Sequence, residues 1–166
     1  MPTLIRWTAG RAMAAEDVFI DVADEDDFPA GDVILSLTRF QAEGDRLIDE
    51  GRKVGVRLSS DEEAEALAYD LPRLALVALE FPKYRDGRAY TNARLLRERL
   101  GFKGEVRAVG DVLREQAGFM IRCGFDAFVP ADGASVQEWQ AAAQRYRHVY
   151  QRAADARVPA YVERGS

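Results

Sequence analysis

Short apolar runs alternate with helix-spaced patterns along most of this chain. Strand-like runs are predicted at five places: 33–37, 54–58, 74–79, 105–109 and 125–129. Between them, apolar side chains recur at helical spacing, and three of the predicted helices end at a glycine (Gly51, Gly101 and Gly124), a residue that takes the left-handed stop conformation without a Cβ clash. Alternation of strands and helices requires parallel strand pairing with right-handed crossovers. The pattern therefore predicts an α/β domain.

The run at 74–79 has no polar alternation and lies between Pro72 and Pro82. Such a run is typical of a strand that helices cover on both faces. We therefore predict an open, mostly parallel three-layer sheet of about five strands, with 74–79 at its centre. A partial β/α barrel is the alternative, since five units cannot close an eight-stranded barrel.

Two serine-to-glutamate spacings predict helix starts, Ser60–Glu63 and Ser135–Glu138, because each is a capping-box pattern. The second opens a final helix whose aromatic and apolar stripe indicates a core face. Residues 1–31 are predicted to form a separate β and loop extension, with an edge strand within 17–22 and a solvated acidic loop after it. Residues 32–153 are predicted to form the single α/β domain, and 154–166 a tail.

Composition narrows the classes of partner. The chain has 166 residues, a formal charge of -5 and a pI near 5.0, which argues against a nucleic-acid binder. No apolar run approaches the roughly 20 residues that span a bilayer, and the first residues lack the apolar core of a signal peptide. Cys123 is the only cysteine, so an intramolecular disulfide is excluded. We expect a cytoplasmic protein without membrane contact.

The commonest cofactor motifs are missing. The chain has neither of the two glycine-rich nucleotide fingerprints, and one cysteine cannot hold an iron–sulfur cluster. His148 is the only histidine, which disfavours a catalytic triad or a histidine metal site. Cys123 is expected in the core, as lone cysteines usually are. We predict no metal and no cofactor.

Arg57 and Arg107 interrupt strands that are otherwise apolar. A buried guanidinium has to be paired, because an isolated charge in a low dielectric is very costly. Glu80, Asp86 and Asp111 are the expected partners, since they follow or end strands at the carboxyl edge of the sheet. One interpretation is therefore an ion-pair network that ties this edge together.

The other interpretation is an anion clamp made of Arg57, Arg88 and Arg107, since the arginine fork matches planar oxyanions. Asp86 with Gly87 and Arg88 also suits a turn. Tyr90 and Asp111 are supporting candidates for proton transfer. These two interpretations stay open, and no catalytic residue is assigned.

The sequence resembles a bacterial family of unknown molecular function, often described as probable oxidoreductases involved in sulfite reduction. The matching segments are 80–82, 86–91, 93–94, 96–97, 100–101, 104–112 and 122–128. The resemblance implies a place in sulfur assimilation and cysteine biosynthesis, beside a sulfite reductase. The family's catalytic residues are not established, so it transfers none to this chain.

Three functions follow as hypotheses. The first is an accessory protein of assimilatory sulfite reduction that binds a small oxyanion or the reductase. The second is an oxidoreductase with an unrecognised cofactor. The third is a structural module that binds a protein partner. An exposed edge strand would also permit a homo-oligomer.

Overall fold

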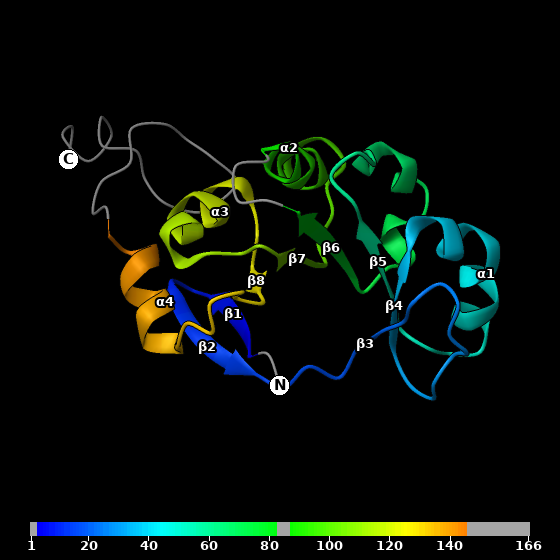
Figure 1. Ribbon diagram of the computed structural model, residues 1–166. Helices are drawn as coiled ribbons and strands as arrows, with labels where there is room; N and C mark the ends of the chain where they lie inside the picture. The colour runs from blue at the N-terminus through cyan, green and yellow to red at the C-terminus, as the bar shows by residue number, and fades with distance from the viewer. Residues whose placement is uncertain (1–2, 83–86, 146–166) are drawn as a thin grey trace.

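The computed structural model describes residues 3–82 and 87–145 of the chain (Figure 1). Its strands form one eight-stranded sheet in the order β2-β1-β8-β7-β6-β5-β4-β3. The pairs from β3 to β8 are parallel, whereas β1 is antiparallel to both β8 and β2. The strands are β1 Leu4–Thr8, β2 Arg11–Ala15, β3 Ile20–Asp21, β4 Val33–Ser36, β5 Val54–Leu58, β6 Leu76–Phe81, β7 Glu105–Gly110 and β8 Ala127–Phe128.

Four α-helices and several tighter or wider turns connect the strands. The α-helices are α1 Leu37–Asp49, α2 Arg88–Arg94, α3 Ala117–Cys123 and α4 Val136–Ala143. Three 3-10 segments are Ala64–Leu67, Leu71–Arg73 and Arg114–Gln116, and a π-helical turn continues α2 over Leu95–Arg99. The helix predicted to start at Ser60 is thus replaced by two short 3-10 segments.

Strand order explains where the helices lie. From β3 to β8, each parallel strand is placed beside the strand that precedes it in the chain. Right-handed crossovers that always advance in one direction put every helix on the same face, as in a β/α barrel. Figure 1 shows the helices along the outer side of a curled sheet. The alternative prediction of a partial barrel fits this arrangement, and the three-layer sheet was wrong.

The two faces of the sheet therefore differ. The face that packs against the helices, the helical face, carries side chains of the main core: Val33, Leu35, Val54, Val56, Leu58, Val77, Leu79, Phe81, Val106, Ala108 and Phe128. The opposite face is called the open face. By strand alternation it carries Ile34, Arg57, Leu76, Ala78, Glu80, Glu105, Arg107 and Val109.

A small second cluster explains why the 74–79 run has no polar alternation. Leu76 and Ala78 are buried on the open face with Ile34, and Phe19 and Val109 pack against them. The second cover of this strand is thus one aromatic side chain from the N-terminal segment instead of a layer of helices. An apolar run therefore indicates that both faces of a strand are covered, but it does not indicate which part of the chain covers them.

Residues 1–31 contribute strands to both edges of the sheet. β1 and β2 form a hairpin beside β8, with Ala9 and Gly10 at positive φ (52° and 80°), as a two-residue hairpin turn requires. The predicted edge strand within 17–22 shrinks to β3, which pairs with β4. The sequence prediction of about five strands missed this hairpin.

The short link between β2 and β3 accounts for the curl. Only Glu16 to Phe19 lie between Ala15 and Ile20, and five Cα steps span at most about 18 Å. Seven strand spacings across a flat sheet would amount to about 34 Å. The sheet must bend until its two edges come within reach of this link. Residues 16–19, here called the strap, cross the open face.

Several predicted starts and stops are confirmed. The Ser135 Oγ accepts the Glu138 N–H (3.1 Å), and Gly51 and Gly124 end their helices at positive φ. The first capping pattern is shifted by one residue, because Glu62 accepts the Ser59 N–H at 2.9 Å. The predicted second half of the final helix, including His148, and the tail at 154–166 lie outside the described residues.

Candidate functional site

Arg57 and Arg107 lie in one row across the open face. The register pairs Arg57 with Ala78 on β6, and Ala78 with Arg107 on β7. Two strand spacings place their Cα atoms about 10 Å apart. The residue between them on the open face, Ala78, has only a small side chain.

Arg107 is the most buried charged residue among those the structure describes, with 2% of its surface exposed. Its Nη1 donates to Asp17 Oδ2 at 2.9 Å, and its Nε donates to Glu105 Oε2 at 2.8 Å. Glu105 also pairs with Arg6 (3.2 Å). The Nη2 of Arg107 is buried and has no hydrogen-bond partner in the described part of the chain. Two carboxylates thus balance this charge but leave one end of its fork unused.

The partners of both arginines differ from those expected. Arg57 pairs with Asp21, and Arg107 pairs with Asp17 and Glu105. Glu80 and Asp111 were therefore wrong as the predicted partners of these two arginines. The third predicted partner, Asp86, is not among the described residues. Two of the actual partners come from the N-terminal segment, which β3 and the strap bring across the sheet. Strand alternation along the chain gives no signal of that return.

The other predicted residues are spread over the molecule. Glu80 shares the open face with Arg107 on the neighbouring strand. Arg88 begins α2 on the helical side and adds its charge to the Ser59 and backbone hydrogen bonds that lower the pKa of Asp61. Asp111 follows β7, where its N–H donates to the Phe81 carbonyl (2.7 Å). Because Arg88 lies on the helical side and Arg57 and Arg107 lie on the open face, the three arginines are not brought together. Asp86 lies outside the described residues.

Tyr90 belongs to the core beneath α2 and α3. Its ring contacts Phe81, Phe119 and Phe125, with centroids 5.1, 4.7 and 6.3 Å away. Its hydroxyl is buried without a partner in the described residues. Burial, with a smaller contribution from Cys123, raises the pKa of Tyr90 to about 12. A hydroxyl that holds its proton so firmly is poorly suited to proton transfer near neutral pH.

Cys123 is fully buried, as predicted. Burial raises the pKa of its thiol above the ordinary value, although the neighbouring Arg94 acts in the opposite direction. A thiol that stays protonated is a weak nucleophile, so the structure gives Cys123 a packing role.

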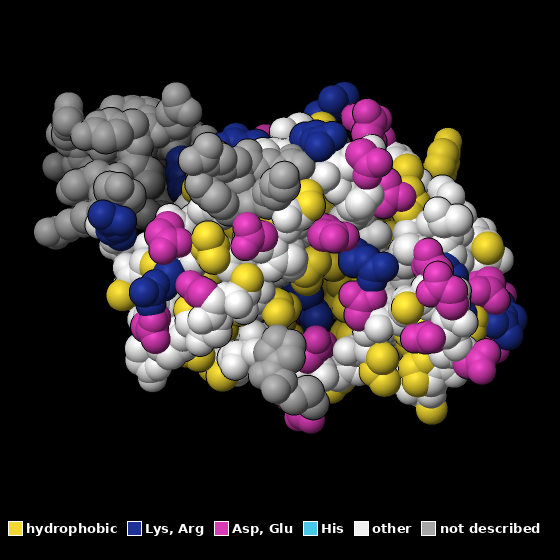
Figure 2. Space-filling model, in the orientation of Figure 1, with side chains coloured by type: hydrophobic (Ala, Val, Ile, Leu, Met, Phe, Trp, Pro, Cys, Tyr) yellow, Lys and Arg dark blue, Asp and Glu magenta, His cyan; other side chains and the backbone are white. Residues whose placement is uncertain are grey.

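A pocket of about 370 Å³ opens at the amino ends of β5, β6 and β7. It is lined by Arg6, Thr8, Phe19, Lys53, Ala75, Leu76, Lys103, Gly104, Glu105 and Asp126, and is called here the amino-end pocket. The volume of the amino-end pocket lies within the usual range for small-molecule sites, about 300–1,000 Å³. Figure 2 shows one face of the molecule, with a hollow near its middle around which basic, acidic and hydrophobic side chains lie.

Positive charge exceeds negative charge around this pocket. Lys53 and Lys103 are exposed, and neither ammonium group has an ion-pair partner among the described residues. The carboxylates are occupied: Glu105 by two arginines, and Asp126 by Arg97 at 3.2 Å and by the Val106 N–H at 2.8 Å. Burial raises the pKa of Asp126, and the charge of Arg97 opposes that change. An anion would meet free ammonium groups here.

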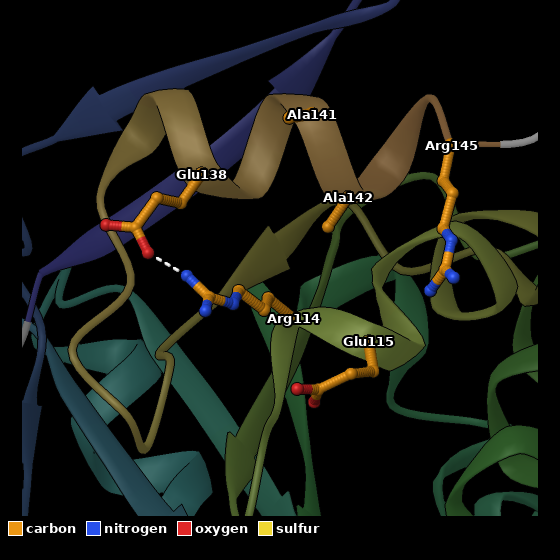
Figure 3. A pocket seen from close by; sticks show the side chains of 6 residues that line it. All are labelled: Arg114, Glu115, Glu138, Ala141, Ala142 and Arg145. Atoms are coloured by element: carbon orange, nitrogen blue, oxygen red, sulfur yellow. Dashed lines mark hydrogen bonds and ion pairs between the residues drawn. The ribbon is translucent and has the colours of Figure 1, made fainter.

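A second pocket of about 410 Å³ lies between α4 and the 3-10 segment at 114–116 (Figure 3). In Figure 3, Arg114 reaches across to Glu138, with which it forms an ion pair, while Glu115 and Arg145 line the other side. Two basic and two acidic side chains line this pocket, so its charges balance. It is the weaker candidate for an anion.

Sequence reasoning missed the amino-end pocket for an identifiable reason. Lys53 directly precedes the strand at 54–58, and Lys103 precedes the strand at 105–109 by two residues. In a parallel sheet these positions meet at the amino edge, whereas sites in such sheets are expected at the carboxyl edge. Pairing the starts of the strands would have brought the two lysines together.

Comparison with known proteins places the chain in a family. No curated protein matches it. Among the described residues, none of the helices has the length and apolar character needed to cross a membrane. The profile of a family described as "Bacterial protein of unknown function (DUF934)" matches residues 55–161, which is more than half of the chain. The chain therefore belongs to this bacterial family of unknown function.

Proposed function

We propose that this protein is an accessory protein of assimilatory sulfite reduction that binds a small oxyanion in the amino-end pocket. The observation that carries the ligand half is the pair of ammonium groups on Lys53 and Lys103, which lack ion-pair partners among the described residues and face one pocket. The pathway half is supported by the resemblance of residues 80–128 to proteins described in terms of sulfite reduction.

The electrostatic argument extends beyond the two lysines. Around the pocket and the network behind it, five cations (Arg6, Lys53, Arg97, Lys103 and Arg107) face three carboxylates (Asp17, Glu105 and Asp126). The chain as a whole has a charge of -5, so this excess of positive charge is local. Such a region raises the local concentration of small anions. The role we propose is to hold and deliver the oxyanion.

Titration calorimetry with sulfite, and separately with sulfate, tests this proposal at constant ionic strength. We expect Lys103→Ala to weaken binding about tenfold, since a hydrogen bond to a charged group contributes about 1.5 kcal/mol or more. Arg46→Ala is the matched control, because it removes an exposed cation from α1 on the helical side. No binding to the unaltered protein, or equal losses in the two variants, would contradict the ligand half.

Capture of the reductase tests the partner half. Immobilised protein should retain sulfite reductase subunits from a native extract, and retention of other partners alone would favour a structural module. The ion pairs of Arg107 with Asp17 and Glu105 are the observation that favours the structural module.

An absorption spectrum of freshly purified protein tests the oxidoreductase hypothesis, since a bound flavin, haem or cluster absorbs visible light.

A further inference from the structure

Arg107 is built like an anion site that the protein itself occupies. Only 2% of its side chain is exposed, and its buried Nη2, which has no partner among the described residues, is an unused donor. Glu105 takes the Nε, so the Nη1 and Nη2 edge is the one left for a second acceptor. Asp17 accepts from Nη1 alone, at 2.9 Å, and leaves Nη2 without an acceptor. A forked guanidinium is best satisfied by two parallel oxygens.

The strap is held on the open face by few contacts. Asp17 reaches Arg107, and Phe19 packs on Ile34, Leu76 and Ala78 while its ring lies 6.0 Å from the Arg107 guanidinium carbon. Val18 between them is 59% exposed. None of the residues 16–19 belongs to a strand, so no ladder of backbone hydrogen bonds fixes the strap to the sheet. Withdrawing the Asp17 and Phe19 side chains breaks their contacts with Arg107 and with the cluster around Leu76, but it breaks no backbone ladder of the sheet.

The strap also forms part of the wall of the amino-end pocket. Phe19 lines that pocket, and Glu105 connects the pocket-lining Arg6 to the buried Arg107. An oxyanion that enters between Lys53 and Lys103 therefore meets the strap as the cover between itself and Arg107.

We infer that the strap is an internal cover and that the Asp17 carboxylate is a stand-in for the ligand. An oxyanion with two acceptor oxygens, such as a sulfite, sulfate or carboxylate group, displaces Asp17 and bonds both Nη1 and Nη2 of Arg107. Glu105 stays in place and positions the guanidinium. This inference rests on the proposed function in that it takes an oxyanion as the ligand of this face.

The first test compares two carboxylate variants by calorimetry with sulfate and sulfite at constant ionic strength. Asp17→Ala should bind about tenfold more tightly than the unaltered protein, since the internal competitor is gone. Asp21→Ala is the matched control, because it removes a carboxylate from the same segment that pairs with Arg57 instead. No gain in Asp17→Ala, or an equal gain in Asp21→Ala, would overturn the inference.

A second variant and a measurement on the unaltered protein guard against misfolding. Adding Arg107→Lys to Asp17→Ala should abolish the gain, because lysine offers a point charge without a fork. In the unaltered protein, saturating sulfate should speed hydrogen exchange at the Phe19 amide, which donates to Asp17 Oδ1 at 3.1 Å. A retained gain in the double variant, or an unchanged exchange rate, would each count against the strap as a cover.

The two proposals fail in different ways. Binding that Lys103→Ala weakens but Asp17→Ala leaves unchanged would support the amino-end pocket and overturn the internal cover. A gain in Asp17→Ala that Lys103→Ala does not reduce would support the Arg107 site and contradict the pocket. If sulfate and sulfite bind neither the unaltered protein nor Asp17→Ala, both proposals are wrong.

Discussion

Unpartnered buried atoms separate two kinds of polar residue in this protein. Arg107 lies on the open face, beside a pocket and under a strap with few contacts. Tyr90 and Trp139 lie on the helical side among aromatic rings, where their polar atoms have no partner among the described residues. A missing hydrogen-bond partner therefore suggests a binding role at Arg107 and a cost of close packing at Tyr90 and Trp139.

Replacing Tyr90 with phenylalanine should stabilise the fold. The buried hydroxyl has no partner among the described residues, and leaving such a group unsatisfied costs about 1 kcal/mol or more. We expect Tyr90→Phe to raise the free energy of unfolding by about that amount in chemical denaturation. Tyr69→Phe is the control, since Tyr69 is 98% exposed and its change should be near zero. A clear loss of stability in Tyr90→Phe would reveal an unseen partner.

The same residue predicts an alkaline limit. The pKa of Tyr90 is raised to about 12, above about 10 in the unfolded chain, because burial disfavours the charged form. Below about pH 10, Tyr90 is neutral in both the folded and the unfolded state, so its ionisation costs no stability. As the pH rises from 10 through 12, the unfolded chain loses this proton more readily than the folded protein, and the free energy of unfolding falls. Tyr90→Phe should lose less stability than the unaltered protein between those values. Equal losses in denaturation series would contradict the assignment to Tyr90.

At the scale of elements, the sequence identified most starts and stops but not the hairpin. Glycine stops and the Ser135 cap depend on local backbone geometry, so they are readable from neighbouring residues. Strand β2 is short and rich in alanine, which gives it a weak strand preference. It is held by contacts distant in sequence, such as the hydrogen bond from the Ala12 N–H to Gln140. No local sequence pattern indicates such contacts.

The hairpin should be as important to stability as the central strands. Ile5 on β1 is fully buried in the main core. We expect Ile5→Ala to cost about 3 kcal/mol in denaturation experiments, as truncations in a packed core do. Met13 on β2 is 58% exposed, so Met13→Ala should cost little. Similar small effects at both positions would show that residues 1–31 are a loosely attached extension.

Gly110, the last residue of β7, sets the position of Asp111. Its φ is +89°, and a Cβ there would lie 2.5 Å from the Phe81 carbonyl oxygen. Gly110→Ala should therefore cost about 2 kcal/mol or more, since strain of the backbone and a clash with a main-chain atom add together. Gly133→Ala, also at positive φ but with nothing within 4 Å, isolates the conformational part. Equal costs in the two variants would contradict the close approach.

For the whole molecule, the α/β class was readable and the layering was not. Alternating strands and helices predict parallel pairing, but they do not state the order in which strands lie side by side. The order from β3 to β8 follows the chain without reversal, which places the helices on one face and leaves the other for the strap. Arg57 and Arg107 were correctly singled out, whereas their partners depend on that unpredicted return of the N-terminal segment.

The pairing of β1 with β8 also governs how this chain can fold. Ile5 on β1 lies opposite Phe128 on β8, so β1 pairs with a strand far along the chain. Contacts between residues so far apart in sequence form late and slow folding, because a long loop must be closed first. Until β8 emerges, Leu4 and Ile5 remain without their final cover. While Leu4 and Ile5 lack that cover they can associate with other chains, so the interval before β8 pairs with β1 is a stage of folding prone to aggregation.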